Sequence, residues 1–181
     1  MKATLQLFNL TLVSVLLLAS TGGVATADQT TTVRAALQSA ADRNPAPNLS
    51  LFNSSGRSVE LKDYRGKVIL LDFWATWCHG CKEEIPWFSN FDRKYGLKGF
   101  TVIGVSMDEG GWKVVNPFLA GIKVHYPMLL GDKPTAEQFG INALPDTFLI
   151  DREGRIAATY KAALVNKNDV EANIRALLSK F

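Results

Sequence analysis

The residues with the clearest chemical potential are Cys78 and Cys81, the only two cysteines among 181 residues. Spaced as Cys-x-x-Cys, they could form a redox couple, part of a metal site, a haem attachment site or a structural disulfide. Zinc would need two further ligands, and only His79 and His125 are available, so no metal site is expected. A haem site needs histidine after the second cysteine, where this chain has Lys82. A structural disulfide closing so short a loop would contribute only roughly 2 kcal/mol, so redox chemistry is favoured.

The surrounding sequence places the cysteines where a strand meets a helix. Residues 68–74 are almost continuously apolar, as in a central strand buried on both faces. After Cys78, apolar residues recur at helical spacing from Ile85 to Tyr95. Unpaired N–H groups and the dipole at a helix N-terminus lower the pKa of a thiol placed there. Cys78 is therefore the expected attacking sulfur, and Cys81, one turn further on, is the shielded sulfur expected to resolve a mixed disulfide.

The remainder of the chain alternates between strand and helix patterns. A hairpin is predicted from 49–52 and 58–61, further strands over 100–106, 126–130, 147–150 and 156–161, and helices over 112–122, 135–139 and 169–178. This order predicts an α/β fold in which helices flank a central sheet.

The N-terminal residues form a different kind of segment. Residues 1–27 begin with Met1-Lys2, a short basic start, continue into an apolar run at 10–19 and end in Ala-Thr-Ala, which is typical of a secretory signal. An uncleaved membrane anchor is the alternative. We expect 28–46 to be a tether, with a short helix over 33–41, and the folded domain to span 47–181. The chain is thus expected to be exported, where disulfides persist.

The charge pattern adds little. The formal net charge is +3, and no run of like charge is longer than a pair, so nucleic acid is not an expected partner. Contact with a membrane is expected only through the N-terminal segment.

Two further motifs carry a family resemblance. Residues 69–82, followed by Glu83-Glu84-Ile85-Pro86, and the later segment 144–151 resemble the TlpA/ResA/DsbE branch of exported thioredoxin-like proteins, which is related to the AhpC/TSA redoxins. The likeness covers roughly 47–181. It implies a thioredoxin-like fold, with a central mixed β-sheet flanked by helices, an N-terminal β-hairpin and a helix-strand insertion near 112–130.

The resemblance also implies roles for two acids. Asp72 matches the buried thioredoxin carboxylate that helps to deprotonate the resolving cysteine, here Cys81. Glu84 matches an acid typical of this branch near the active site, with a solvated charge on the helix face as the alternative. Many relatives carry Asn at the position of Asp72, so the division of labour between the two acids stays open.

The remaining site residues flank the cysteines. Pro145 matches the cis-proline of the family, beside which the backbone of Leu144 would pair with an extended substrate. Trp77 either shields the sulfurs or meets the substrate. His79 could favour the Cys78 thiolate and an oxidising couple, or could point into solvent, whereas Asp72 argues for a reductant.

Together these features predict an exported thiol-disulfide oxidoreductase that needs no cofactor. The resemblance favours reduction of disulfides in extracytoplasmic proteins, including cytochrome c maturation, with electrons from a membrane thiol donor. A thiol peroxidase is one alternative, although Thr76 lies two residues before Cys78 rather than three. A redox-silent module that binds peptides is the other.

Overall fold

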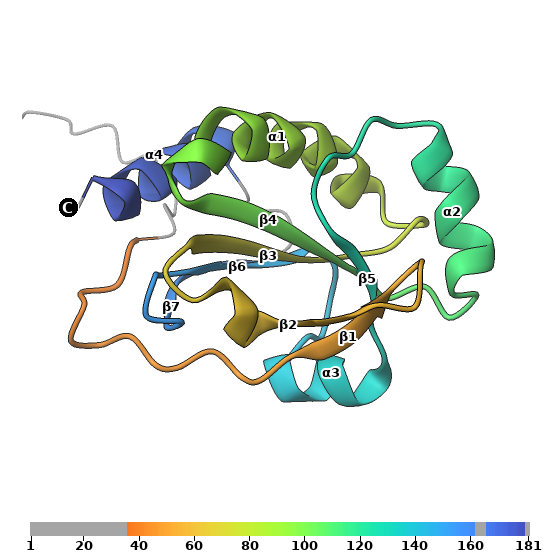
Figure 1. The fold of residues 1–181 in the computed structure, drawn as a ribbon, viewed down its shortest axis with the longest axis horizontal. Helices are drawn as coiled ribbons and strands as arrows, with labels where there is room; N and C mark the ends of the chain where they lie inside the picture. The colour runs from red at the N-terminus through yellow and green to blue at the C-terminus, as the bar shows by residue number, and fades with distance from the viewer. Residues whose placement is uncertain (1–35, 162–165, 180–181) are drawn as a thin grey trace, which may run out of the picture. The chain divides into compact units, whose positions relative to one another are not determined.

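A seven-stranded mixed sheet forms the centre of the protein in the computed structural model, which describes residues 36–161 and 166–179 (Figure 1). The strands are β1 (Ser50–Asn53), β2 (Ser58–Glu60), β3 (Val68–Trp74), β4 (Phe100–Ser106), β5 (Met128–Leu130), β6 (Asp146–Ile150) and β7 (Ile156–Lys161). Their order across the sheet is β2-β1-β5-β4-β3-β6-β7. The β5-β4 and β4-β3 pairs are parallel, and the other pairs are antiparallel.

The two parallel strands β3 and β4 are largely apolar because both of their faces are covered. Every residue of β3 and of β4 is buried, as expected for parallel strands between two layers. In register, Asp72 of β3 lies between Gly104 of β4 and Thr147 of β6. The one acid in β3 is therefore enclosed by neighbouring strands as well as by the layers above and below.

Helices cover both faces of the sheet. They are α1 (His79–Tyr95), α2 (Trp112–Ala120), α3 (Lys133–Phe139) and α4 (Lys167–Leu178). Helices α1 and α4 lie on one face and α3 on the other (Figure 1). On the α3 face, Phe73 packs against Phe139 and Phe148, with ring centroids 5.1 and 5.9 Å away. On the α1 face, the Trp74 ring packs against Phe118 of α2, with 5.4 Å between the ring centroids.

Apart from the short helix expected over 33–41, the structure contains the helices and strands that the sequence predicts, and their ends follow local capping. Helix α3 begins earlier than expected because the Asp132 side chain accepts the Thr135 N–H, and α4 begins earlier because Asn166 caps it. Gly96, directly after α1, has right-handed backbone angles and starts a 3-10 turn, so it does not reverse the chain. The chain turns instead at Gly99, which has a φ of 84°.

The segment before the hairpin differs from the expected tether. Gln38 donates its N–H to Ala157 O and Ala46 donates to Gly154 O. Between them, the buried Arg43 guanidinium lies 3.1 Å from the Asp151 carboxylate. Residues 36–41 contain no helix. The predicted tether is therefore wrong for residues 38–46, because backbone bonds and a buried ion pair fix them to the domain. The predicted signal segment lies outside the described residues.

No helix within the described ranges is both long and apolar enough to cross a membrane.

Candidate active site

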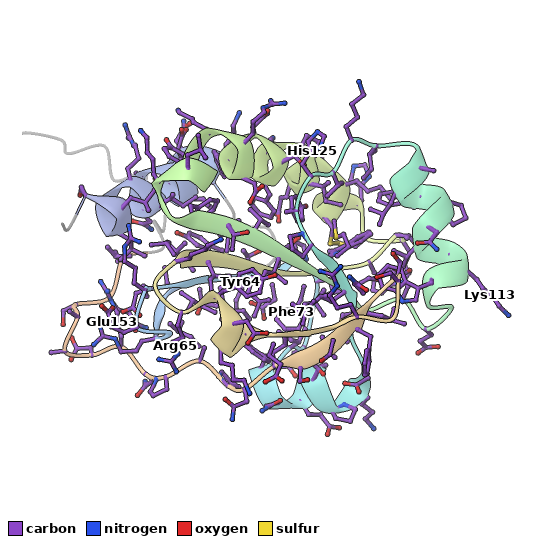
Figure 2. The ribbon with its side chains drawn as sticks, viewed as in Figure 1. Tyr64, Arg65, Phe73, Lys113, His125 and Glu153 are labelled. Atoms are coloured by element: carbon purple, nitrogen blue, oxygen red, sulfur yellow. A yellow bond between two sulfur atoms is a disulfide. The ribbon has the colours of Figure 1, made fainter. Side chains whose placement is uncertain are left out.

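The two cysteines form a disulfide at the point where β3 runs into α1, and Figure 2 draws it as a yellow bond. Cys78 is the N-cap of α1, and its Sγ accepts the Cys81 backbone N–H at 3.2 Å. Cys78 is 6% exposed, whereas Cys81 is fully buried. The first sulfur thus sits among the N–H groups that favour a thiolate, and the second lies behind it, as the sequence predicts.

Asp72 lies on the face of β3 that packs against α1. Because side chains two residues apart share a face of a strand, Asp72 lies on the same face as Leu70 and Trp74, which belong to the same core cluster as both cysteines. Asp72 is 1% exposed, and its Oδ1 accepts the Thr147 hydroxyl at 3.1 Å, while its Oδ2 has no partner among the described residues. Burial raises the pKa of Asp72 to about 7, although the Thr147 bond opposes the shift. Asp72 is therefore a buried carboxyl group, as the resemblance implies for this position.

Glu84 is also buried, one turn after Cys81 on α1. It is 5% exposed, and its Oε2 has no partner in the described part of the chain. Burial raises the pKa of Glu84 to about 8, with a further contribution from the charge of Asp72. The alternative of a solvated charge on the helix face is therefore excluded, and two acids titrate near neutral pH on the α1 side of the sheet.

The residues on the outer side of the motif face solvent. The His79 side chain is 91% exposed, and its Nε2 lies 3.4 Å from Glu83 Oε1 one turn along α1. Trp77 is 69% exposed. His79 thus occupies the solvent position that the sequence left as an alternative, and most of the Trp77 side chain is also open to solvent.

The loop before β6 completes the site. The Leu144–Pro145 peptide bond is cis. A Cβ at Gly80, between the two cysteines, would lie 3.6 Å from the Pro145 ring. Pro145 is buried and Leu144 is half-buried. The structure therefore brings this loop against the first turn of α1, next to the disulfide.

Sequence reasoning missed two buried acids near the site. Asp108, just after β4, accepts the Thr76 N–H at 2.9 Å and the Thr76 hydroxyl at 2.6 Å. Asp146, which follows Pro145, lies 2.9 Å from Lys161 Nζ. An acid two residues after a buried strand was the available signal for Asp108, because β4 is parallel to β3, the strand that leads to the cysteines, and ends beside it.

The described residues include no group of three or more His, Cys, Asp or Glu side chains placed to hold a metal ion. The chemistry that the arrangement offers is thiol-disulfide exchange, with a nucleophile at a helix N-terminus and acids of suitable pKa close by.

Comparisons with known proteins agree with this chemistry. The AhpC/TSA family model matches residues 43–159. Thiol-disulfide oxidoreductase ResA of Bacillus subtilis (strain 168) is 34% identical over 125 residues, covering 68% of this chain and 69% of the relative. A similar ResA from Bacillus thuringiensis subsp. konkukian is 35% identical over 118 residues, covering 64% of this chain and 67% of the relative.

Solved structures share the fold. A protein assigned as thiol:disulfide interchange protein DsbE from Chlorobium tepidum is 31% identical with a TM-score of 0.70, covering 80% of this chain and all of that one. The thioredoxin domain of a thiol-disulfide oxidoreductase from Bacteroides vulgatus is 29% identical with a TM-score of 0.66, covering 75% of this chain and 96% of that domain. This chain therefore belongs to the AhpC/TSA family, and it is a thioredoxin-like thiol-disulfide oxidoreductase of the ResA/DsbE type.

Proposed function

We propose that this chain is an exported reductase for disulfides of extracytoplasmic proteins, with Cys78 and Cys81 as its redox couple. One observation carries the proposal. The disulfide begins a helix beside two buried acids, Asp72 and Glu84, whose pKa values are raised to about 7 and about 8.

In the reduced enzyme, the Cys78 thiolate attacks one sulfur of the substrate disulfide. A bond forms between Cys78 Sγ and that sulfur, and the other substrate sulfur leaves as a thiolate that takes up a proton. Cys81 then loses its proton and attacks Cys78 Sγ. The second substrate sulfur leaves and is protonated, so the substrate gains two electrons and two protons while the enzyme becomes the disulfide form seen here.

The buried acids serve the second step. A thiol has an ordinary pKa of about 8.5, so a carboxylate with a pKa of about 7 or 8 can take its proton at small cost. Asp72 is the proposed proton acceptor for Cys81. Both lie on the α1 side of the sheet, where Cys81 packs in one core cluster with Leu70 and Trp74, the neighbours of Asp72 on its face of β3. Glu84 modulates the proton affinity of Asp72, since the negative charge of either acid opposes ionisation of the other.

The direction of the reaction also follows from the acids. Negative charge on Asp72 or Glu84 disfavours thiolates beside it and so destabilises the reduced enzyme, which makes it a stronger reductant. The opposing effect of His79 is limited, because its side chain is 91% exposed and faces Glu83. The balance supports reduction rather than oxidation of substrates.

Substrate and electron supply complete the proposal. Pro145 and the Leu144 backbone, next to Gly80, hold the substrate chain in an extended conformation. The likeness to ResA and DsbE proteins supports extracytoplasmic targets, including cytochromes c before haem attachment. A thiol donor in the membrane would return two electrons to the Cys78–Cys81 disulfide, and the N-terminal residues 1–27 would direct export or anchor the chain.

The test is the reduction potential of the Cys78–Cys81 couple, measured against thiol buffers by alkylation. We expect a value near the figure of about −270 mV for thioredoxin or below it. A value of about −120 to −180 mV would overturn the proposed direction, because it is typical of oxidases and isomerases. Cys81→Ser should trap a mixed disulfide through Cys78, whereas the matched Cys78→Ser variant should trap none.

A further inference from the structure

The end of the sheet away from the disulfide carries a protruding apolar side chain. Leu97 lies in the turn between α1 and β4, bounded by Gly96 and Gly99, and it is fully exposed. Among the large hydrophobic residues in the described part of the chain it is the most exposed. A single exposed leucine is common on protein surfaces, so the argument depends on the groups that surround it.

Cations surround Leu97. Residues 93–98 contain three basic side chains and no acid, and all three basic residues are exposed. Lys94 Nζ and Lys98 Nζ lie 5.1 and 5.9 Å from the centre of the Tyr95 ring. A ring face attracts a cation at this distance, so both ammonium groups are held at the turn that carries Leu97.

A second basic loop lies beside this turn. The Arg152 guanidinium donates to Gly66 O at 2.7 Å and to Lys98 O at 3.3 Å, so it bridges the loop before β3 and the turn after α1. The loop before β3 adds two exposed cations next to Leu97. The two loops and their cations form what we call the Leu97 surface: Arg65, Lys67, Arg93, Lys94, Leu97 and Lys98.

The acids near this surface, among the described residues, offset only part of its charge. Glu171 lies 2.6 Å from Lys94 Nζ. Glu153 pairs with Arg155 at 3.1 Å rather than with a member of the surface. Asp63 is exposed in the segment that leads into the loop before β3. The Leu97 surface therefore keeps an excess of positive charge around its apolar residue.

The Leu97 surface and the disulfide stand at opposite ends of α1. Cys78 caps the first turn of this 17-residue helix, and Leu97 follows its last turn. At a rise of 1.5 Å per residue, the two ends of α1 are about 25 Å apart. The described chain also enters the domain at the end with Leu97 (Figure 1), where the Gln38 N–H donates to Ala157 O near the start of β7.

We propose that the Leu97 surface docks onto a bilayer that contains anionic lipid, with Leu97 inserted among the headgroups and the cations against lipid phosphates. Anionic lipid attracts Lys and Arg side chains held close to a membrane. A bilayer also accepts a protruding apolar side chain without a preformed pocket, which a folded protein partner would need. The docked domain would present its disulfide on the side away from the bilayer.

This inference goes beyond the redox function and concerns a different part of the molecule. It adds a contact made by the folded domain to the membrane contact expected from the N-terminal residues 1–27. If those residues form an anchor, the anchor is joined to the domain at the end that carries Leu97, so the two contacts can act together.

Tryptophan quenching in vesicles tests the docking. The full oxidised chain with Leu97→Trp is reconstituted into brominated phosphatidylcholine vesicles, with or without about one third phosphatidylglycerol. The fluorescence that this Trp adds should be quenched at least about fivefold more in the anionic vesicles, and about 1 M salt should remove the difference by screening. The matched control is Phe52→Trp, which replaces another exposed hydrophobic residue, on β1, and should be quenched in neither lipid.

Charge reversal tests the cations of the surface. Lys67→Glu combined with Lys98→Glu should lower the quenching of Leu97→Trp in anionic vesicles at least about threefold. The matched control combines Lys113→Glu with Lys123→Glu, which changes the net charge equally at exposed positions outside the surface and should preserve the quenching.

Three results would overturn the docking. Equal quenching of Leu97→Trp with and without phosphatidylglycerol would mean that an N-terminal anchor alone places the domain. Quenching no greater than in Phe52→Trp would mean that the surface meets no bilayer, as expected if it binds an acidic protein instead. An equal effect of the two charge reversals would mean that net charge, and not this surface, governs binding. All the measurements use oxidised protein without substrate, so their failure is distinguishable from failure of the proposed reductase activity.

Discussion

Two buried acidic sites lie toward opposite ends of the sheet, and their carboxylates differ in what surrounds them. Asp72 lies on the side of the sheet that holds the disulfide, and among the described residues its carboxyl group accepts one hydrogen bond, from Thr147. Asp151 follows β6 at the other end, in the region where Figure 2 labels Arg65 and Glu153. One Asp151 oxygen accepts backbone N–H groups and the other accepts Arg43 and Arg155 side chains, at 3.1 and 2.9 Å.

The two sites have opposite electrostatic outcomes. Burial raises the pKa of Asp72 to about 7. Burial also acts to raise the pKa of Asp151, but the bonds from Arg155 and Arg43 outweigh it and hold the pKa below its usual value. Asp151 is therefore a permanent charge that fastens residues 38–46, whereas Asp72 can exchange a proton near neutral pH. Incomplete hydrogen bonding of a buried acid distinguishes the reactive end of the sheet from the structural end.

Asp151→Asn should give the largest effect. It leaves the Arg43 side chain, which is 3% exposed, without its charged partner, so we expect a loss of about 3 kcal/mol in the free energy of unfolding at pH 7. Because the folded pKa of Asp151 is lowered, its contribution is full above the unfolded pKa of about 4 and is lost as the pH falls through the folded pKa. Urea denaturation of the oxidised protein at pH 7, and at a series of pH values that extends below about 4, measures this loss.

The matched control for Asp151 is Glu153→Gln, since Glu153 pairs with the same Arg155 from an exposed position. Glu153→Gln should lower the free energy of unfolding by less than about 1 kcal/mol. Equal losses in the two variants would mean that the buried pair does not fasten this end of the domain.

Asp72→Asn should change stability in the opposite direction. The folded pKa of Asp72 is about 7, above its unfolded value, so the wild type loses stability as the pH rises from about 4 to about 8. The variant avoids this loss and should be more stable at pH 8, on the order of 2 kcal/mol, with no gain at pH 4. Denaturation curves at both pH values check it.

The same variant should slow resolution of the mixed disulfide, because a proton acceptor for Cys81 is lost. A rate reduction of at least about tenfold at pH 7 is expected for removal of a general base. Glu84→Gln is the companion variant. If it slows resolution more than Asp72→Asn does, the proposed roles of the two acids are reversed.

His79→Ala should have the smallest effect. The imidazole and Glu83 form an exposed pair, where solvent screens the charge. We expect the reduction potential to move by less than about 30 mV, which corresponds to a tenfold change in the equilibrium constant. A larger shift would show that the outer side of the motif, and not the buried acids, sets the potential.

Much of the fold was predictable because its signals are local. The apolar run of β3 and the helical spacing after Cys78 depend on neighbouring residues alone. Burial of Glu84 had a signal as well, since it falls on the helix face of Cys81, Ile85 and Phe88. The sequence could not show the Arg43–Asp151 pair, whose members are 108 residues apart. It also could not show the Thr76–Asp108 bonds, because strand pairing brings those residues together.

The bond from the Cys81 N–H to Cys78 Sγ has a consequence for observing the enzyme at work. The atom that caps α1 is the atom that changes its covalent partner during turnover, so the environment of one amide proton differs between the thiolate, the mixed disulfide and the disulfide. The chemical shift of that proton in an NMR spectrum would therefore report each redox state without any label on the sulfurs. The first turn of α1 therefore carries a spectroscopic probe of the redox state in its own backbone.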